Sequence, residues 1–129
     1  MSAHILFVDD EAPIRETLSL YFKAKGIDVS TAETGDEAVR MIEETPFNLA
    51  ILDVKLGREN GLDLLDRFKA AHPSLPVIMF TSLGDDLELL TEALAKGAEG
   101  YMNKNESVDI LIKEVERALQ RATADKSSA

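Results

Sequence analysis

Apolar residues follow two alternating patterns along the chain. Short runs of consecutive apolar residues predict five strands, at 4–8, 27–32, 48–52, 76–80 and 99–102. Longer segments, in which apolar residues recur every three or four positions, predict five helices between and after them, at 13–25, 36–44, 62–71, 86–96 and 107–121. We expect one domain over 1–122, and a flexible tail or linker stub over 123–129, where no apolar periodicity is left.

The spacing within the helices predicts which side chains face the core. In the first helix this stripe is Ile14, Leu18, Tyr21 and Phe22, and in the fourth it is Leu87, Leu90 and Leu94. The middle strands are apolar at consecutive rather than alternating positions, which is typical of strands covered by helices on both faces. Together these patterns predict an α/β fold with a single five-stranded parallel sheet.

Composition narrows the class of protein. The chain has 129 residues, enough for one core, and carries 24 acidic against 14 basic residues, a formal charge of −10 that disfavours direct nucleic acid binding. It has no cysteine, which excludes disulfides and thiolate metal sites. No apolar run approaches the ~20 residues of a membrane-spanning helix. We therefore expect a soluble cytoplasmic protein without membrane contact.

Polar side chains follow four of the predicted strands. Asp9 and Asp10 come after the first, Asp53 after the third, Thr81 at the end of the fourth and Lys104 after the fifth. The carboxyl ends of parallel strands meet at one edge of the sheet, where open α/β folds bind ligands. Three carboxylates there repel one another unless one is protonated or a cation joins them, and oxygen ligands without His or Cys suit Mg²⁺.

This set of residues also predicts phosphoryl chemistry. With Mg²⁺ on the acids, Lys104 and Thr81 could hold the other oxygens of a phosphoryl group, and Asp53 could act as its nucleophile. Each residue alone has an ordinary structural interpretation, such as helix capping by Asp10 and Glu11 ahead of a helix that begins near Pro13. Four loops that each bring a suitable group to one edge favour the functional interpretation.

The ordered set resembles the receiver domain of bacterial two-component response regulators. The resemblance covers residues 4–122 and depends on ILFVDDE, on LAILDVKLGRENGLDLL with Gly61 eight residues after Asp53, on PVIMFTS and on GAEGYMNK. It implies a flavodoxin-like fold with strand order 2-1-3-4-5 and five helices on both faces of the sheet. It further implies a phosphoacceptor switch, which promotes only its own phosphorylation and dephosphorylation and is otherwise no enzyme.

The resemblance also implies roles for individual residues. Asp53 is then the phosphoacceptor. Asp10, Asp53 and the Lys55 backbone carbonyl hold Mg²⁺, Asp9 assists through water, Thr81 and Lys104 contact the phosphoryl group, and the Tyr101 rotamer reports the active state. Lys55 and Leu83 match positions that flank the path of the hydrolytic water. The implied partners are a histidine kinase or phosphotransfer protein and a downstream output domain or protein, with a phosphorylation-dependent dimer allowed.

Two positions depart from the family pattern. Receivers usually carry proline four residues after the phosphoacceptor and directly after the lysine, where this chain has Gly57 and Asn105. The lysine–proline bond is often cis in the family, but a cis bond before Asn105 would cost about 2.5–4 kcal/mol. We therefore expect a trans Lys104–Asn105 peptide.

Three other functions share part of the pattern. A flavin-binding electron carrier has this architecture, but acids at 9–11 would repel its phosphate. A phosphatase of the haloacid dehalogenase type would need a second acid where Lys55 stands, and a longer chain. The third alternative is a receiver used only as an interaction module and never phosphorylated; the complete set of acids, hydroxyl and lysine argues against it.

Overall fold

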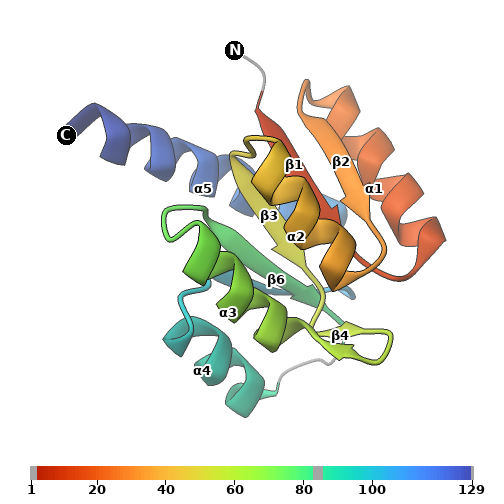
Figure 1. Ribbon diagram of the computed structural model, residues 1–129. Coiled ribbons are helices and arrows are strands. Elements are labelled where there is room, and N and C mark those ends of the chain that lie inside the picture. Colours follow the sequence, from red (N-terminus) through yellow and green to blue (C-terminus); the bar gives the residue numbers. More distant parts are fainter. Residues whose placement is uncertain (1–2, 83–85, 129) are drawn as a thin grey trace.

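The computed structural model describes residues 3–82 and 86–128, with side chains up to residue 122. Leu83, predicted to flank the path of the hydrolytic water, lies outside these residues. Five parallel strands form the main sheet: β1 (His4–Val8), β2 (Asp28–Ala32), β3 (Leu49–Leu52), β6 (Val77–Thr81) and β7 (Gly100–Asn103). Their order across the sheet is β2-β1-β3-β6-β7, which confirms the predicted order 2-1-3-4-5 (Figure 1).

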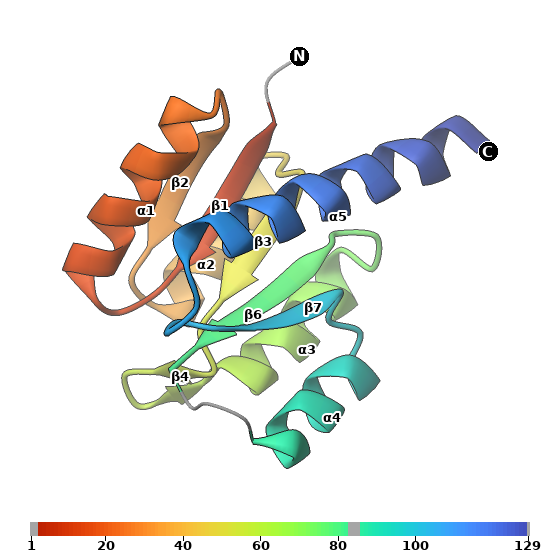
Figure 2. The same cartoon turned by 180° about the vertical axis from the view of Figure 1, so that it is seen from behind.

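Helices cover both faces of the sheet, as predicted. They are α1 (Ala12–Ala24), α2 (Gly35–Glu44), α3 (Gly61–Ala71), α4 (Leu87–Ala95) and α5 (Val108–Ser128). α2, α3 and α4 lie on the face seen in Figure 1, and α1 and α5 lie on the face seen in Figure 2. α5 extends further than the helix predicted over 107–121. Within residues 3–82 and 86–128, none of the helices combines the length and the apolar character that a membrane span requires.

The core consists of one apolar layer on each face of the sheet. Successive strand residues point to opposite faces, so β1 sends Leu6 and Val8 to the layer under α2 and α3, and Ile5 and Phe7 to the layer under α1 and α5. These four side chains have no exposed surface. The consecutive apolar run is therefore explained by burial on both faces.

Two predicted helix faces are wrong in part. Tyr21 is 48% exposed, because Leu18 and Phe22, four residues apart on the same side of α1, fill the space against the sheet. In α4, Leu87 and Leu94 are 72% and 50% exposed, and it is Ala93 that is buried. α4 carries leucines on more than one side, so that apolar spacing alone does not determine which side faces the core.

A short hairpin not predicted from the sequence follows β3. β4 (Lys55–Leu56) pairs with β5 (Glu59–Asn60) in antiparallel fashion, and the turn between them contains Gly57 and Arg58. Gly57 has φ +60° while Arg58 does not have a positive φ, a combination found in type II′ turns, which prefer glycine at the first central position. The hairpin lies directly beyond Asp53.

Candidate functional site

The residues singled out in the sequence meet at one edge of the sheet. Asp9 follows β1, Asp53 follows β3, Thr81 ends β6 and Lys104 follows β7, all at the carboxyl ends of parallel strands. Backbone hydrogen bonds continue between neighbouring strands at this edge: Asp53 N–H donates to the Val8 carbonyl at 3.3 Å, and Lys104 N–H donates to the Thr81 carbonyl at 2.8 Å. The backbone of the site is therefore held by the sheet itself.

Three aspartates form a compact group there. Asp9, Asp10 and Asp53 each offer a carboxylate oxygen, and these atoms lie within 4.8 Å of one another. Asp9 and Asp53 are 0% and 4% exposed, whereas Asp10 is exposed to solvent. Two buried carboxylates side by side are costly unless positive charge compensates them.

Lys104 supplies one such charge. Its ammonium Nζ lies 2.6 Å from Asp53 Oδ2, 2.8 Å from Asp9 Oδ2 and 3.0 Å from Glu11 Oε2. Burial alone would lower the pKa of Lys104, but the neighbouring carboxylates of Asp53, Asp9 and Glu11 outweigh it and raise that pKa above its usual value. Lys104 is therefore held in its charged form against the acids.

Glu11 is a contact that the sequence interpretation missed. It stands at the N-cap of α1 but makes no side-chain capping hydrogen bond, and its carboxylate pairs with Lys104 instead. Its own backbone N–H donates to Asp9 Oδ1 at 2.9 Å, which orients the Asp9 carboxylate. The sequence offered one signal for this contact: Asp9, Asp10 and Glu11 are consecutive acids that precede the same helix.

Asp9 retains an unsatisfied oxygen. Its Oδ2 is buried and, among the described residues, accepts no hydrogen bond, because Lys104 approaches it as an ion pair without hydrogen-bond geometry. Burial raises the pKa of Asp9, and Lys104 only partly opposes this effect. A buried carboxylate oxygen that accepts no hydrogen bond, beside two further carboxylates, fits a hard divalent cation with oxygen ligands.

Thr81 and Tyr101 lie on the face of the sheet that α4 covers. Thr81 is fully buried at the end of β6, and alternation along that strand places it on the same face as Met79, which pairs in register with Tyr101. The Tyr101 hydroxyl is buried and, among the described residues, has no hydrogen-bond partner. Burial raises the pKa of Tyr101, with smaller contributions from the charges of Asp86 and Asp53.

The loops after Asp53 and Lys104 contain the other predicted positions. The Lys55 side chain is exposed, whereas the Lys55 backbone N–H donates to Asp53 Oδ1 at 3.1 Å. The role of the Lys55 backbone carbonyl as a metal ligand stays a prediction. The Lys104–Asn105 peptide is trans, as predicted. Asn105 N–H donates to Asn103 Oδ1 at 2.9 Å, a bond that proline at this position could not make.

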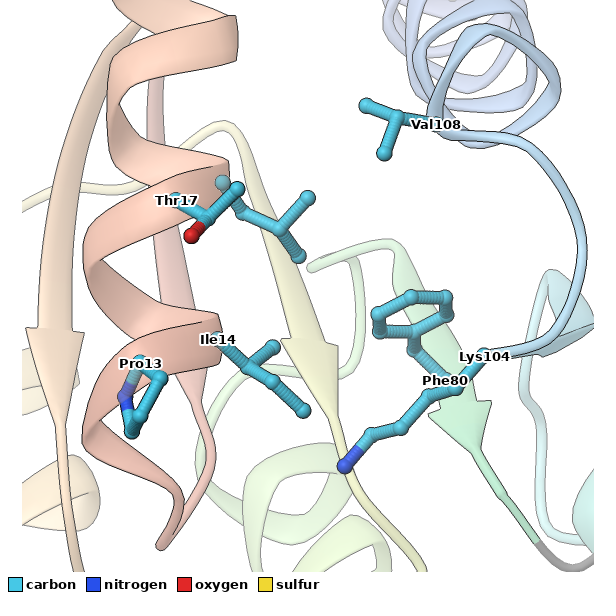
Figure 3. Close-up of a pocket in the computed structure, with 7 residues that line it drawn as sticks. Pro13, Ile14, Thr17, Phe80, Lys104 and Val108 are labelled. Carbon is cyan, nitrogen blue, oxygen red and sulfur yellow. The ribbon is translucent and has the colours of Figure 1, made fainter.

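A small apolar pocket adjoins the site between α1 and α5. It has a volume of about 250 Å³ and is lined by Pro13, Ile14, Thr17, Leu18, Phe80, Lys104 and Val108 (Figure 3). Lys104 lines this pocket and also contacts the Asp53 carboxylate through its ammonium group.

Comparisons with known proteins agree with this geometry. The chain is 36% identical over 104 residues to the regulatory protein VanRc of Enterococcus gallinarum, and 35% identical over 122 residues to the nitrogen assimilation regulatory protein NtrX of Azorhizobium caulinodans. These alignments cover 81% and 93% of this chain but 44% and 27% of the relatives. The chain therefore spans less than half the length of either relative.

Solved structures show the same fold. The structure of a CheY-like response regulator receiver domain protein from Methanospirillum hungatei superimposes with a TM-score of 0.92 at 29% identity, covering 97% of this chain and 99% of that one. A signal receiver domain of a Luxo repressor protein from Vibrio parahaemolyticus also gives 0.92, at 30% identity, with 99% and 98% covered. The family model of the response regulator receiver domain matches residues 5–116. With this match over most of the chain, the protein belongs to the family of response regulator receiver domains.

Proposed function

We propose that this domain is a phosphoacceptor switch in which Asp53 receives a phosphoryl group from a histidine kinase or a phosphotransfer protein. An Asp53 oxygen attacks the phosphorus of phosphohistidine, the P–N bond breaks, and its electron pair returns to the imidazole nitrogen. The observation that carries the proposal is the buried Asp53 carboxylate, 2.6 Å from the Lys104 ammonium and grouped with Asp9 and Asp10. The domain promotes its own phosphorylation and dephosphorylation, and no other reaction is proposed for it.

The charge balance supports a metal-dependent reaction. Lys104 contacts Asp9, Glu11 and Asp53, and the Asp10 carboxylate lies beside the other two aspartates, so an incoming phosphoryl group would meet an excess of negative charge. Bound Mg²⁺ would neutralise that charge and polarise the phosphoryl oxygens. Asp10, Asp53 and the Lys55 carbonyl would hold the ion, and Asp9 would assist through water. Lys104 and the Thr81 hydroxyl would orient the transferred group.

Phosphorylation can be tested directly on the isolated chain. With Mg²⁺ and acetyl phosphate as donor, intact-mass measurement should show one added phosphoryl group, and chelation of the metal should prevent it. Asp53→Asn should remain unlabelled, while Asp28→Asn, an exposed aspartate on edge strand β2, should be labelled like wild type. Labelling of Asp53→Asn at the wild-type rate would refute the assignment, and an unlabelled wild type would leave only the interaction module.

The proposed output surface consists of α4, β7 and α5, within residues 86–121. Leu87 and Leu94 on α4 and Ile110 on α5 are large apolar side chains with exposures of 44% or more, which supports contact with another protein or domain. The two curated relatives extend well beyond the matched region, which supports an output domain elsewhere in a longer chain or a separate partner.

Thr81 and Tyr101 would connect the site to this surface. A phosphoryl group on Asp53 offers Thr81 a charged acceptor, and its movement would free space for the Tyr101 ring on the same face. Thr81→Ala should still accept phosphate but lose most of the amide NMR shift changes that beryllofluoride produces near Tyr101 and along α4. Thr17→Ala, an exposed threonine on α1, should respond like wild type. Unchanged shifts in Thr81→Ala would exclude this route.

A further inference from the structure

The β4–β5 hairpin contacts the aspartate group through the backbone of Gly57. Gly57 N–H donates to Asp10 Oδ2 at 3.0 Å. Lys104 contacts Asp9, Glu11 and Asp53, whereas the exposed Asp10 carboxylate is oriented by the hairpin. Asp10 is thus oriented by a different contact from the ion pairs that Lys104 makes with the other acids.

This contact depends on glycine at position 57. Its φ of +60° is strained for other residues, and proline, with φ near −65° and no N–H, could neither adopt this conformation nor make the bond. In the type II′ turn Gly57 directs its N–H toward Asp10. The departure from the usual proline therefore has a specific structural consequence at the acidic group.

The returning strand of the hairpin is anchored at a helix N-terminus. Glu59 Oε2 accepts a hydrogen bond of 2.7 Å from the N–H of Gly35, the first residue of α2. A carboxylate at this end of a helix satisfies a free N–H group and interacts favourably with the helix dipole. A Cβ at Gly35 would lie 3.0 Å from Glu59 Oε2, so a larger residue there would displace the end of the Glu59 side chain. The turn and the returning strand of the hairpin are therefore both tied to the rest of the domain.

We propose that Gly57 and Glu59 are positioning residues for the metal ligand Asp10. Gly57 N–H fixes the orientation of the Asp10 carboxylate before the cation arrives, and Glu59 holds the hairpin in the place where Gly57 can do so. A ligand that is already oriented loses less conformational freedom on binding, which raises metal affinity. This inference rests on the proposed function, because it assigns Asp10 to a Mg²⁺ site.

The test is the affinity of the unphosphorylated chain for Mg²⁺, measured by calorimetric titration. Gly57→Pro removes the N–H and the positive φ, and should weaken binding by about tenfold, the lower end of the range for residues that support metal ligands. Gly57→Ala keeps the N–H and has room for its Cβ, 3.9 Å from Asp10 Oδ2, so it should lose less. Gly26→Ala is the matched control, since Gly26 has φ +78° and open space around it; its affinity should not change.

Substitutions of Glu59 provide a second test, in which the residues of the turn are unchanged. Glu59→Ala should weaken Mg²⁺ binding by a smaller factor than Gly57→Pro, and Glu59→Gln, which keeps the acceptor oxygen, should restore the wild-type affinity. Wild-type affinity in both Gly57→Pro and Glu59→Ala would overturn the inference while leaving phosphorylation of Asp53 untouched. Failure of the proposed function would appear separately, as a wild-type chain that binds Mg²⁺ but takes no phosphoryl group.

Discussion

Gly61→Ala is expected to lower the free energy of unfolding by about 4 kcal/mol. A Cβ at Gly61 would lie 1.8 Å from the backbone oxygen of Asp53 and 2.9 Å from Val54 Cα. Both obstacles are backbone atoms, so no side-chain rotation can relieve the overlap. Gly61 N–H also donates to the Val54 carbonyl, so that the start of α3 would have to separate from the segment after β3. Urea denaturation measures the loss.

The matched control is Gly100→Ala in β7. The nearest atom to a Cβ at Gly100 is Ile78 Cγ1 at 3.9 Å, an ordinary contact, so the change should stay within about 1 kcal/mol. Because Asp53 itself would be displaced, Gly61→Ala should also accept phosphate more slowly under conditions where it remains folded. Equal stability losses at positions 61 and 100 would mean that the close approach is not what requires glycine.

The parallel sheet, and the edge of it that carries the candidate site, were predictable because both follow from short-range patterns in the sequence. The run from Ile5 to Val8 is apolar at every position and is buried on both faces, which determines a parallel sheet. Parallel strands then bring the ends of β1, β3, β6 and β7 to one edge. The grouping of Asp9, Asp10 and Asp53 follows from this topology alone.

The contacts that the sequence did not predict depend on tertiary geometry. Glu11 has the spacing of a helix cap, and its pairing with Lys104, 93 residues away, appears only when the parallel sheet brings the carboxyl ends of β1 and β7 to the same edge. Leu87 and Leu94 are exposed because the side of α4 that carries Ala93 is the one that faces the core. The β4–β5 hairpin is too short for a periodic pattern, and only Gly57 at the first turn position indicated it.

Lys104→Met should destabilise the metal-free protein by about 3 kcal/mol near neutral pH. Methionine keeps the length and apolar stem of the side chain, but removes the ammonium group that contacts Asp9, Asp53 and Glu11. Asp9 and Asp53 are then buried carboxylates without their compensating charge. Lys96→Met, which breaks the exposed pair with Asp66, should change stability little and serves as control.

The loss of stability in Lys104→Met, relative to wild type, should become smaller as the pH is lowered. Burial already raises the pKa of Asp9, and Lys104 is the group that opposes this shift, so the variant should raise that pKa further. A folded-state pKa above the unfolded value of about 4 means that the folded protein binds the proton more tightly. The Lys104→Met variant then loses stability as the pH rises from the unfolded pKa to above the raised folded pKa, and it regains that stability when the pH is lowered again. The raised pKa of Lys104 acts in the same direction in wild type but at higher pH: its contribution to stability is fully present below about pH 10 and is lost as the pH rises through the raised pKa.

Mg²⁺ provides the decisive comparison for Lys104→Met. A cation held by Asp10 and Asp53, with Asp9 assisting through water, would replace part of the charge that the substitution removes, so Mg²⁺ should raise the melting temperature of the variant more than that of wild type. Phosphorylation should remain impaired even with saturating metal, because the transferred group loses the ammonium that offsets its charge. If Mg²⁺ stabilised wild type and Lys104→Met equally, the metal and the lysine would not be neutralising the same carboxylates.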